Sequence, residues 1–306
     1  MECKASQVRT ILNTALPCAL ALALIAATEL SAQAPANADD MLARIGARIA
    51  EFYERAKSVV CTEISSVQPV DSTNSPVGFV RTVESELHIE TGNGPIPGEA
   101  EVVRNIRKVN GRIPRDRDRK DRAGCTDPNP LSSEPLTFLL APHRAQYQFR
   151  AAGTANIRGK AALIIDFESV NRRSDPVLIA DPGGRDDCFD WSGHIASSGR
   201  IWVDAVSYDV LRIERRLRGP VDVRVPLPIQ RRHRLDPTVV IMRDDLTIRY
   251  TTVAFSDPDE MLLLPESIDS FTMIRGGLQS TRRHQRFSEY RRFVTGGRIV
   301  IPDALP

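Results

Sequence analysis

The stretch Gly199-Arg200-Ile201-Trp202-Val203-Asp204, followed by Val210-Leu211-Arg212-Ile213-Glu214, decides how this sequence folds. In both segments apolar and polar side chains alternate with a period of two, which is typical of a strand with one buried face. Only residues 205–209 separate the segments, so the two strands are predicted to pair as an antiparallel hairpin. We expect Ile201, Val203 and Ile213 on its apolar face.

The same period of two extends to both sides of this hairpin. Further strands are expected at residues 59–70, 77–91, 100–109, 145–152, 160–168, 242–255, 262–275 and 277–292. Almost all connections between these roughly ten strands are too short for parallel crossovers. The sequence therefore predicts a mainly β (α+β) fold, in which a mainly antiparallel sheet carries a few helices.

Two segments have the pattern of helices, and three have the composition of loops. Residues 40–57 repeat apolar side chains at steps of three and four, which predicts an amphipathic helix, and a short helix is expected at 131–140. Residues 112–122 contain six basic side chains and a single apolar one, Ile113, so we expect a solvated, mobile loop. Residues 171–199 are expected to be loop-rich, and 218–237 to be extended.

The hairpin and the later segment Leu264-Pro265-Glu266-Ser267-Ile268 together resemble the LolA-type family of periplasmic lipoprotein carriers. In that family a strand with a tryptophan followed by an aspartate, a turn, and a Val-Leu-Arg-Ile-Glu strand form a hairpin, and a later strand opens at Leu-Pro. The resemblance implies a curved antiparallel sheet, an incomplete β-barrel, with the N-terminal and inserted helices over its concave face. It also implies an apolar cavity suited to acyl chains.

The first 38 residues have the three-part layout of a secretory signal peptide. Lys4 and Arg9 precede an apolar run at 11–27, and a polar stretch of small residues follows. We expect cleavage before Asp39 or, less favourably, before Pro35, which is a poor residue at that position. The prediction is an exported, periplasmic or extracellular protein, not membrane-spanning, with a single domain at 39–306.

The charge balance excludes nucleic acid as the main partner. The chain has 41 basic and 39 acidic side chains, a net charge of +2. Its arginines form three groups, at 112–122, 231–234 and 282–283. They could recognise a phosphate-bearing lipid or an anionic envelope polymer, or simply balance neighbouring acids. Arg112, Arg115 and Trp202 are therefore the candidate ligand-binding residues.

Three cysteines follow the predicted signal peptide. Cys125 and Cys188 lie in loop-like sequence and are the expected disulfide pair in an oxidising compartment. Cys61 lies within a predicted strand, where we expect a small buried side chain.

The densest polar cluster is at residues 181–194. A metal could be ligated here by Asp186, Asp187, Asp190 and His194. However, their spacing fits no known calcium loop, and a single histidine is too few for a typical zinc site. No nucleophile motif is present. We expect neither a cofactor nor a metal.

Three functions remain open. The first is a non-enzymatic carrier that holds a hydrophobic ligand, a lipid or a lipoprotein acyl chain, in a half-barrel cavity. The second is an envelope interaction or sensor module that recognises a protein through its sheet edge or its arginine-rich loop. The third is an enzyme centred on residues 186–194.

Overall fold

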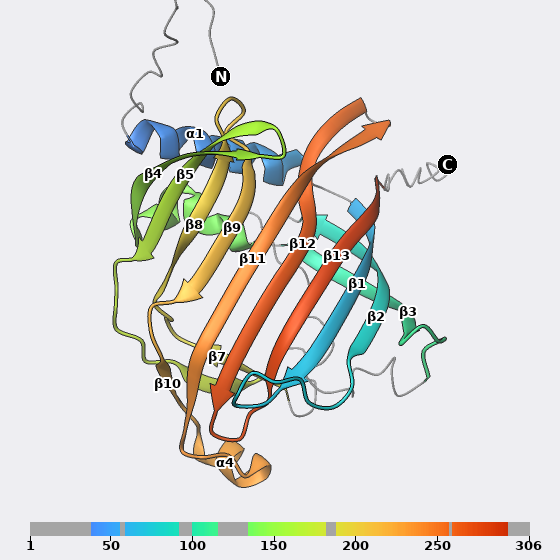
Figure 1. Ribbon diagram of the computed structural model, residues 1–306, viewed down its shortest axis with the longest axis vertical. Coiled ribbons are helices and arrows are strands. Elements are labelled where there is room, and N and C mark those ends of the chain that lie inside the picture. Colours follow the sequence, from blue (N-terminus) through green and yellow to red (C-terminus); the bar gives the residue numbers. More distant parts are fainter. Residues whose placement is uncertain are drawn as a thin grey trace, which may run out of the picture. The chain divides into compact units, whose positions relative to one another are not determined.

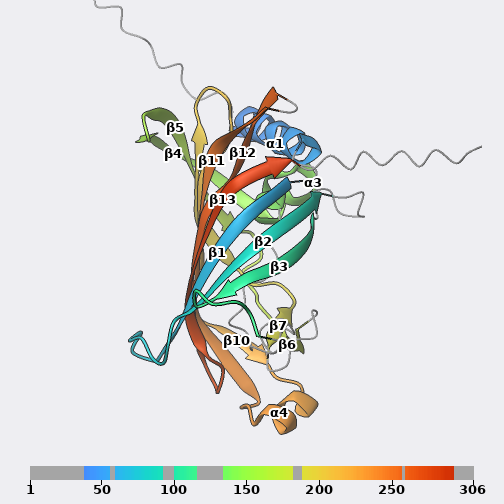
Figure 2. The same cartoon turned by 90° about the vertical axis from the view of Figure 1, so that its right-hand side faces the viewer.

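One long antiparallel sheet forms the body of the protein, with helices on one face (Figures 1 and 2). The computed structural model describes residues 38–55, 59–91, 100–115, 134–181, 188–256 and 259–292, which all belong to one structural unit. The strands are β1 (Val59–Val70), β2 (Arg81–Thr91), β3 (Ala100–Val109), β4 (Tyr147–Ile157), β5 (Lys160–Ser169), β6 (Val177–Ala180), β7 (Phe189–Ser192), β8 (Ser197–Asp204), β9 (Val210–Leu217), β10 (Val221–Arg224), β11 (Thr238–Ser256), β12 (Asp259–Arg275) and β13 (Ser280–Arg292). The helices are α1 (Ala38–Arg55), η2 (Glu134–Leu139, a 3-10 helix), α3 (Ala141–Arg144) and α4 (Leu227–His233).

The sheet order is β3-β2-β1-β13-β12-β11-β9-β8-β5-β4. Every neighbouring pair in this order is antiparallel, and the last strand of the chain, β13, returns to pair with the first, β1. Among the described strands, β3 and β4 lie at the two ends of the order and do not pair with each other. The predicted mainly β fold, a curved antiparallel sheet that does not close, is confirmed.

The predicted hairpin at 199–214 is also confirmed. It consists of β8 and β9, and Ile201 pairs with Ile213. Both side chains are buried, as is Val203, so the alternation of the sequence identifies the buried face correctly.

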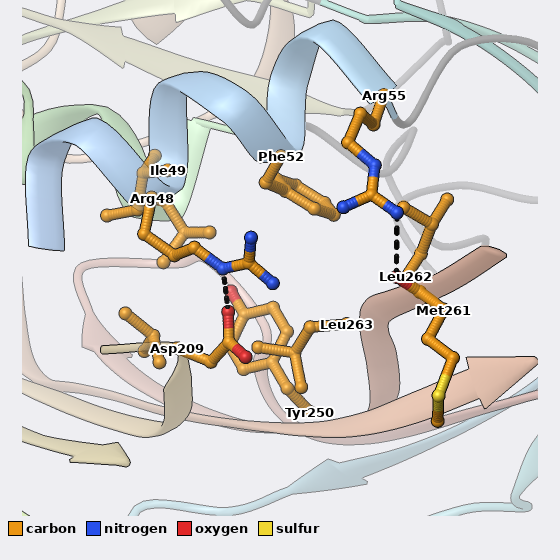
Figure 3. A pocket seen from close by; sticks show the side chains of 11 residues that line it. Arg48, Ile49, Phe52, Arg55, Asp209, Tyr250, Met261, Leu262 and Leu263 are labelled. Carbon is orange, nitrogen blue, oxygen red and sulfur yellow. Dashed lines mark hydrogen bonds and ion pairs between the residues drawn. The ribbon is translucent and has the colours of Figure 1, made fainter. Parts of the chain in front are cut away.

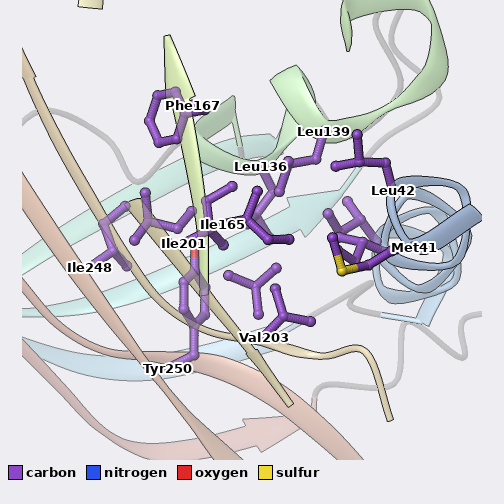
Figure 4. Packing of buried hydrophobic residues seen from close by; sticks show 14 of the residues in the cluster. Met41, Leu42, Leu136, Leu139, Ile165, Phe167, Ile201, Val203, Ile248 and Tyr250 are labelled. Carbon is purple, nitrogen blue, oxygen red and sulfur yellow. The ribbon is translucent and has the colours of Figure 1, made fainter. Parts of the chain in front are cut away.

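Helix α1 lies across the concave face of the sheet and closes the main core (Figure 4). Its first turn carries Asp39 and Asp40, and its last turn carries Arg55, which suits the helix dipole. The apolar stripe of α1 packs against η2 and against β5, β8, β9 and β11. The buried members of this core are Met41, Leu42, Ile45, Ile49, Tyr53, Leu136, Leu139, Ile165, Phe167, Ile201, Val203, Val210, Ile213, Ile248 and Tyr250.

Two expectations about irregular segments need correction. The segment 171–199 contains the short strands β6 and β7, and 218–237 contains β10 and α4, where only loop or extended chain was expected. Strand β10 also makes a parallel bridge to β6, between Arg224 and Val177. Of the predicted mobile loop, residues 112–115 are described, with a bridge between Val109 and Arg112, and 116–122 lie outside the described residues.

Candidate functional site

A narrow crevice lies between α1 and the strands that it covers (Figure 3). Most of its lining is apolar, with Ile49 and Phe52 from the helix facing Tyr250, Leu262 and Leu263 from β11 and β12. The complete lining is Arg48, Ile49, Phe52, Arg55, Leu136, Asp209, Val210, Tyr250, Met261, Leu262 and Leu263. The residues come from opposite ends of the chain because β12 lies beside β11 and α1 crosses both.

Two polar contacts connect α1 to the rim of the crevice, and Figure 3 shows both. Arg48 Nε donates to Asp209 Oδ1 at 2.6 Å, from the helix to the turn between β8 and β9. Near the end of the helix, Arg55 donates to the carbonyl oxygen of Met261 at 3.1 Å and lies 3.4 Å from Glu260 Oε2. Glu260 also pairs with Arg292 of β13. The helix is therefore held over the sheet at two points along its length.

The volume of the crevice is about 20 Å³. This is room for about one water molecule and not for an alkyl chain. In the described structure the apolar face under α1 is therefore filled by the protein's own side chains, and a larger ligand needs the helix to move.

The apolar surface continues beyond the crevice along the concave face. Phe52 contacts both the main core and a second cluster of Val59, Phe255, Leu262 and Leu264. Tyr290 then connects that cluster to a third one, formed by Cys61, Leu87 and Phe287. An apolar track therefore runs from α1 to β2.

A buried charge pair lies at the β1 side of this track. Glu63, which is fully buried, accepts hydrogen bonds from Arg104 Nε at 2.9 Å and from Gln285 Nε2 at 2.7 Å. The neighbouring hydroxyls of Ser65 and Ser85 are buried and have no hydrogen-bond partner among the described residues. Burial raises the pKa of the Cys61 thiol to about 12, with a further contribution from the Glu63 carboxylate.

The structure places Trp202 away from the crevice. It lies between Ile201 and Val203, which are buried in the core, so its ring is on the opposite face of β8. There the Arg212 guanidinium lies 4.8 Å from the ring centroid. Arg112 and Arg115 are exposed beyond the end of β3, and six strands of the sheet order separate β3 from β8. The three candidate ligand-binding residues are therefore not brought together.

The polar cluster of the sequence is described only in part. Asp190 is exposed on β7, and its carboxylate accepts a hydrogen bond from the Trp191 amide at 2.8 Å. His194 Nε2 lies 3.1 Å from the carbonyl oxygen of Asn171. Asp186 and Asp187 lie outside the described residues, and the described residues hold no group of three acidic, histidine or cysteine side chains suited to a metal.

The cysteine predictions differ in outcome. Cys61 is a free and fully buried thiol, as expected. Cys188 is buried next to β7, whereas Cys125 lies outside the described residues, so their pairing stays a prediction.

Sequence reasoning missed the residues that flank the crevice. Arg48 lies within the predicted helix 40–57, and Asp209 lies in the short connection of the predicted hairpin. No local signal connects these two residues, which are 161 positions apart. The sequence offers one signal that could have identified these residues: apolar and basic side chains alternate within the same turns of α1.

Comparison with known proteins adds similarity at the level of the fold. The sequence matches no protein-family description and no curated protein. Similar solved structures include a Vibrio parahaemolyticus domain described as an outer membrane lipoprotein-sorting protein (12% identity, 85% of this chain and 94% of that one, TM-score 0.36). A second is a DUF1329 family protein from Desulfovibrio piger (10% identity, 84% of this chain and 93% of that one, TM-score 0.36). A third is a LolA superfamily protein from Nitrosomonas europaea (9% identity, 86% of this chain and 99% of that one, TM-score 0.31).

All three TM-scores are below 0.5. At such identities and scores no function is carried over to this chain, and function has to be argued from the site. No helix in the described part of the chain has the length and apolar character that crossing a membrane requires.

Proposed function

We propose that this protein is an exported, non-enzymatic carrier that binds the acyl chain of a lipid or lipoprotein against the concave face of the sheet, beneath α1. The observation that carries the proposal is the crevice. A single amphipathic helix, held over the sheet at two points by Arg48 and Arg55, covers an apolar surface that continues to β2. This arrangement supports a ligand that displaces the helix and takes over its contacts.

The energetics set the size of such a ligand. Five side chains of α1 are buried in the core, namely Met41, Leu42, Ile45, Ile49 and Tyr53. At ~2 kcal/mol for each buried side chain, their contacts contribute on the order of 10 kcal/mol. A methylene group contributes ~0.8 kcal/mol on burial, so about twelve methylene groups replace the inner face of the helix. The proposed ligand is therefore a long acyl chain.

The polar contacts at the rim are suited to a helix that moves. Arg48 and Asp209 have side chains 32% and 18% exposed, and Arg55 is 33% exposed. Ion pairs with this exposure stabilise by about 1 kcal/mol or less. They fix where α1 lies in the empty protein without adding a large cost to its displacement.

The test is displacement of a dansyl-labelled fatty acid by a series of fatty acids from octanoate to palmitate. We expect competition to begin at about twelve methylene groups and to strengthen towards palmitate. Leu263→Arg places a charge in the crevice and should abolish binding, whereas Val206→Arg, at an 86% exposed position of the neighbouring turn, should leave it intact. Equal binding by both variants, or by octanoate and palmitate, would contradict the proposal.

The proposed location follows from the signal peptide. Cleavage before Asp39 puts the new N-terminus in the first turn of α1, which begins at Ala38. Cleavage before Pro35 leaves residues 35–38 ahead of it. N-terminal sequencing of the exported protein distinguishes the two sites.

A second candidate function is recognition of a partner protein through the sheet edge. Strand β4, with eleven residues, lies at the end of the described strand order. Its outer backbone groups could pair with an extended segment of another chain. Pro substitution at Thr154 of β4 should abolish such binding and leave fatty-acid binding unchanged.

A further inference from the structure

The described members of the three arginine groups are far apart along the chain but lie towards the same end of the sheet. The end of β1 pairs with the start of β13, and the start of β2 lies beside the end of β3, where Thr82 N donates to Asn110 Oδ1 at 2.7 Å. The turn between β12 and β13 approaches Leu235, just after α4. We define the basic end by its described segments, residues 71–81, 110–115, 227–236 and 275–283.

The basic end is strongly positive. It contains two acidic side chains, Asp71 and Asp236. Its nine arginines are Arg81, Arg112, Arg115, Arg231, Arg232, Arg234, Arg275, Arg282 and Arg283. Nine minus two gives +7, whereas the whole chain carries only +2, so the rest of the chain is net negative. The described segments of the basic end therefore carry a net positive charge that the rest of the chain lacks.

The same end carries exposed apolar side chains. Phe79 is 95% exposed, Ile113 81% and Leu227 53%, and Val77 and Val80 are exposed as well. These five are half of the ten large apolar side chains that are exposed among the described residues. Apolar side chains surrounded by arginines are typical of a surface that binds at a membrane interface.

The loop that presents Phe79 is built by specific hydrogen bonds. The Asp71 carboxylate accepts hydrogen bonds from the Thr73 hydroxyl at 2.7 Å and from the amides of Ser75 and Thr73 at 2.9 and 2.8 Å, which lowers the pKa of Asp71. Farther along the loop, Val77 N donates to the carbonyl oxygen of Pro69, and Gln68 Nε2 donates to that of Val77, both at 2.9 Å. The loop is therefore held on β1, and Phe79 projects from a supported turn.

We propose that the basic end docks on the surface of a bilayer that contains anionic lipid. Its arginines attract the lipid phosphates, and Phe79, Ile113 and Leu227 insert between the headgroups. A soluble polyanion would contact only the arginines and would leave these apolar side chains in water. A bilayer would contact both the arginines and the apolar side chains, so it fits this surface better. Residues 261–263, which line the crevice, lie at the start of β12, whereas the basic end begins at the other end of this strand, so docking leaves the crevice accessible.

The test is flotation of the full chain with vesicles of phosphatidylcholine, with and without phosphatidylglycerol. We expect binding only to the anionic vesicles, and weaker binding at high salt. A triple variant with Arg112→Gln, Arg231→Gln and Arg282→Gln removes one exposed arginine from each group. It should lose about fivefold in vesicle affinity for each arginine.

A matched triple variant controls for net charge. Its substitutions are Arg150→Gln, Arg158→Gln and Arg172→Gln, at side chains 81%, 58% and 78% exposed outside the basic end. It should bind the vesicles like the unmodified protein. Equal loss in both triple variants would overturn the proposal, because the binding would then follow net charge alone.

A second pair of variants tests the apolar contribution. Phe79→Ser should weaken vesicle binding about tenfold, whereas Val206→Ser, at the 86% exposed turn between β8 and β9, should not. Circular dichroism checks that every variant folds. Binding of inorganic polyphosphate that matches vesicle binding and does not depend on Phe79 would identify a polyanion site and overturn the proposal.

Discussion

Replacing Arg104 by methionine should leave the buried carboxylate of Glu63 without its charge partner. The Glu63 side chain is 0% exposed, and Arg104 is its charge partner at 2.9 Å. Removing one partner of a buried ion pair costs about 3–5 kcal/mol. We therefore expect a loss of about 3 to 5 kcal/mol in the free energy of unfolding at pH 7.

Urea denaturation at pH 7 measures this loss. The double variant Glu63→Gln with Arg104→Met removes both charges and should recover most of the loss at pH 7.

A control on the same strand separates burial from charge. Lys108 is paired with Glu84 at 2.9 Å and is 51% exposed, so Lys108→Met should cost less than about 1 kcal/mol. A loss in Arg104→Met that is equally small, or one that the double variant does not reduce, would refute the reasoning.

Three further predictions concern stability and reactivity. Cys61 should not react with a maleimide in the native protein, because its thiol is buried and its pKa is about 12, and mass spectrometry should detect modification only in denaturant. Gly199→Ala should lower the melting temperature strongly, because a Cβ there would lie 2.0 Å from the carbonyl oxygen of Glu214; Gly219→Ala, with no atom within 4 Å, is the control. A hydrogen bond from Arg200 lowers the pKa of Asp166, so the pair stabilises the fold fully above the unfolded-state pKa near 3.8 and less as the pH falls further; Arg200→Gln should flatten acid unfolding measured by circular dichroism.

The long strands could be predicted from the sequence because their alternation is local. The expected strands 59–70 and 100–109 coincide with β1 and β3. Strands β6, β7 and β10 were missed because each has only four residues, too few to show a period, and they lie in segments rich in proline, glycine and arginine. Helix α4 was missed because it is short and has proline in its first turn.

The candidate site could be predicted less well, since it depends on contacts between distant segments. Alternation shows that Glu63 shares a face with Cys61 and Val67, but not that Arg104 lies opposite. The alternation in β8 likewise separates Trp202 from Ile201 and Val203. It does not show which of the two faces α1 covers, and this decides that Trp202 lies outside the core. The convergence of the three arginine groups depends on strand order, which no single segment contains.

The most direct test of the account is the distance between α1 and the sheet when an acyl chain binds. Spin labels at Ala50→Cys, on the exposed side of α1, and Thr252→Cys, on an exposed position of β11, report this distance by pulsed electron resonance. The account predicts that palmitate lengthens the distance and that octanoate does not. Saturable palmitate binding with an unchanged distance would contradict it.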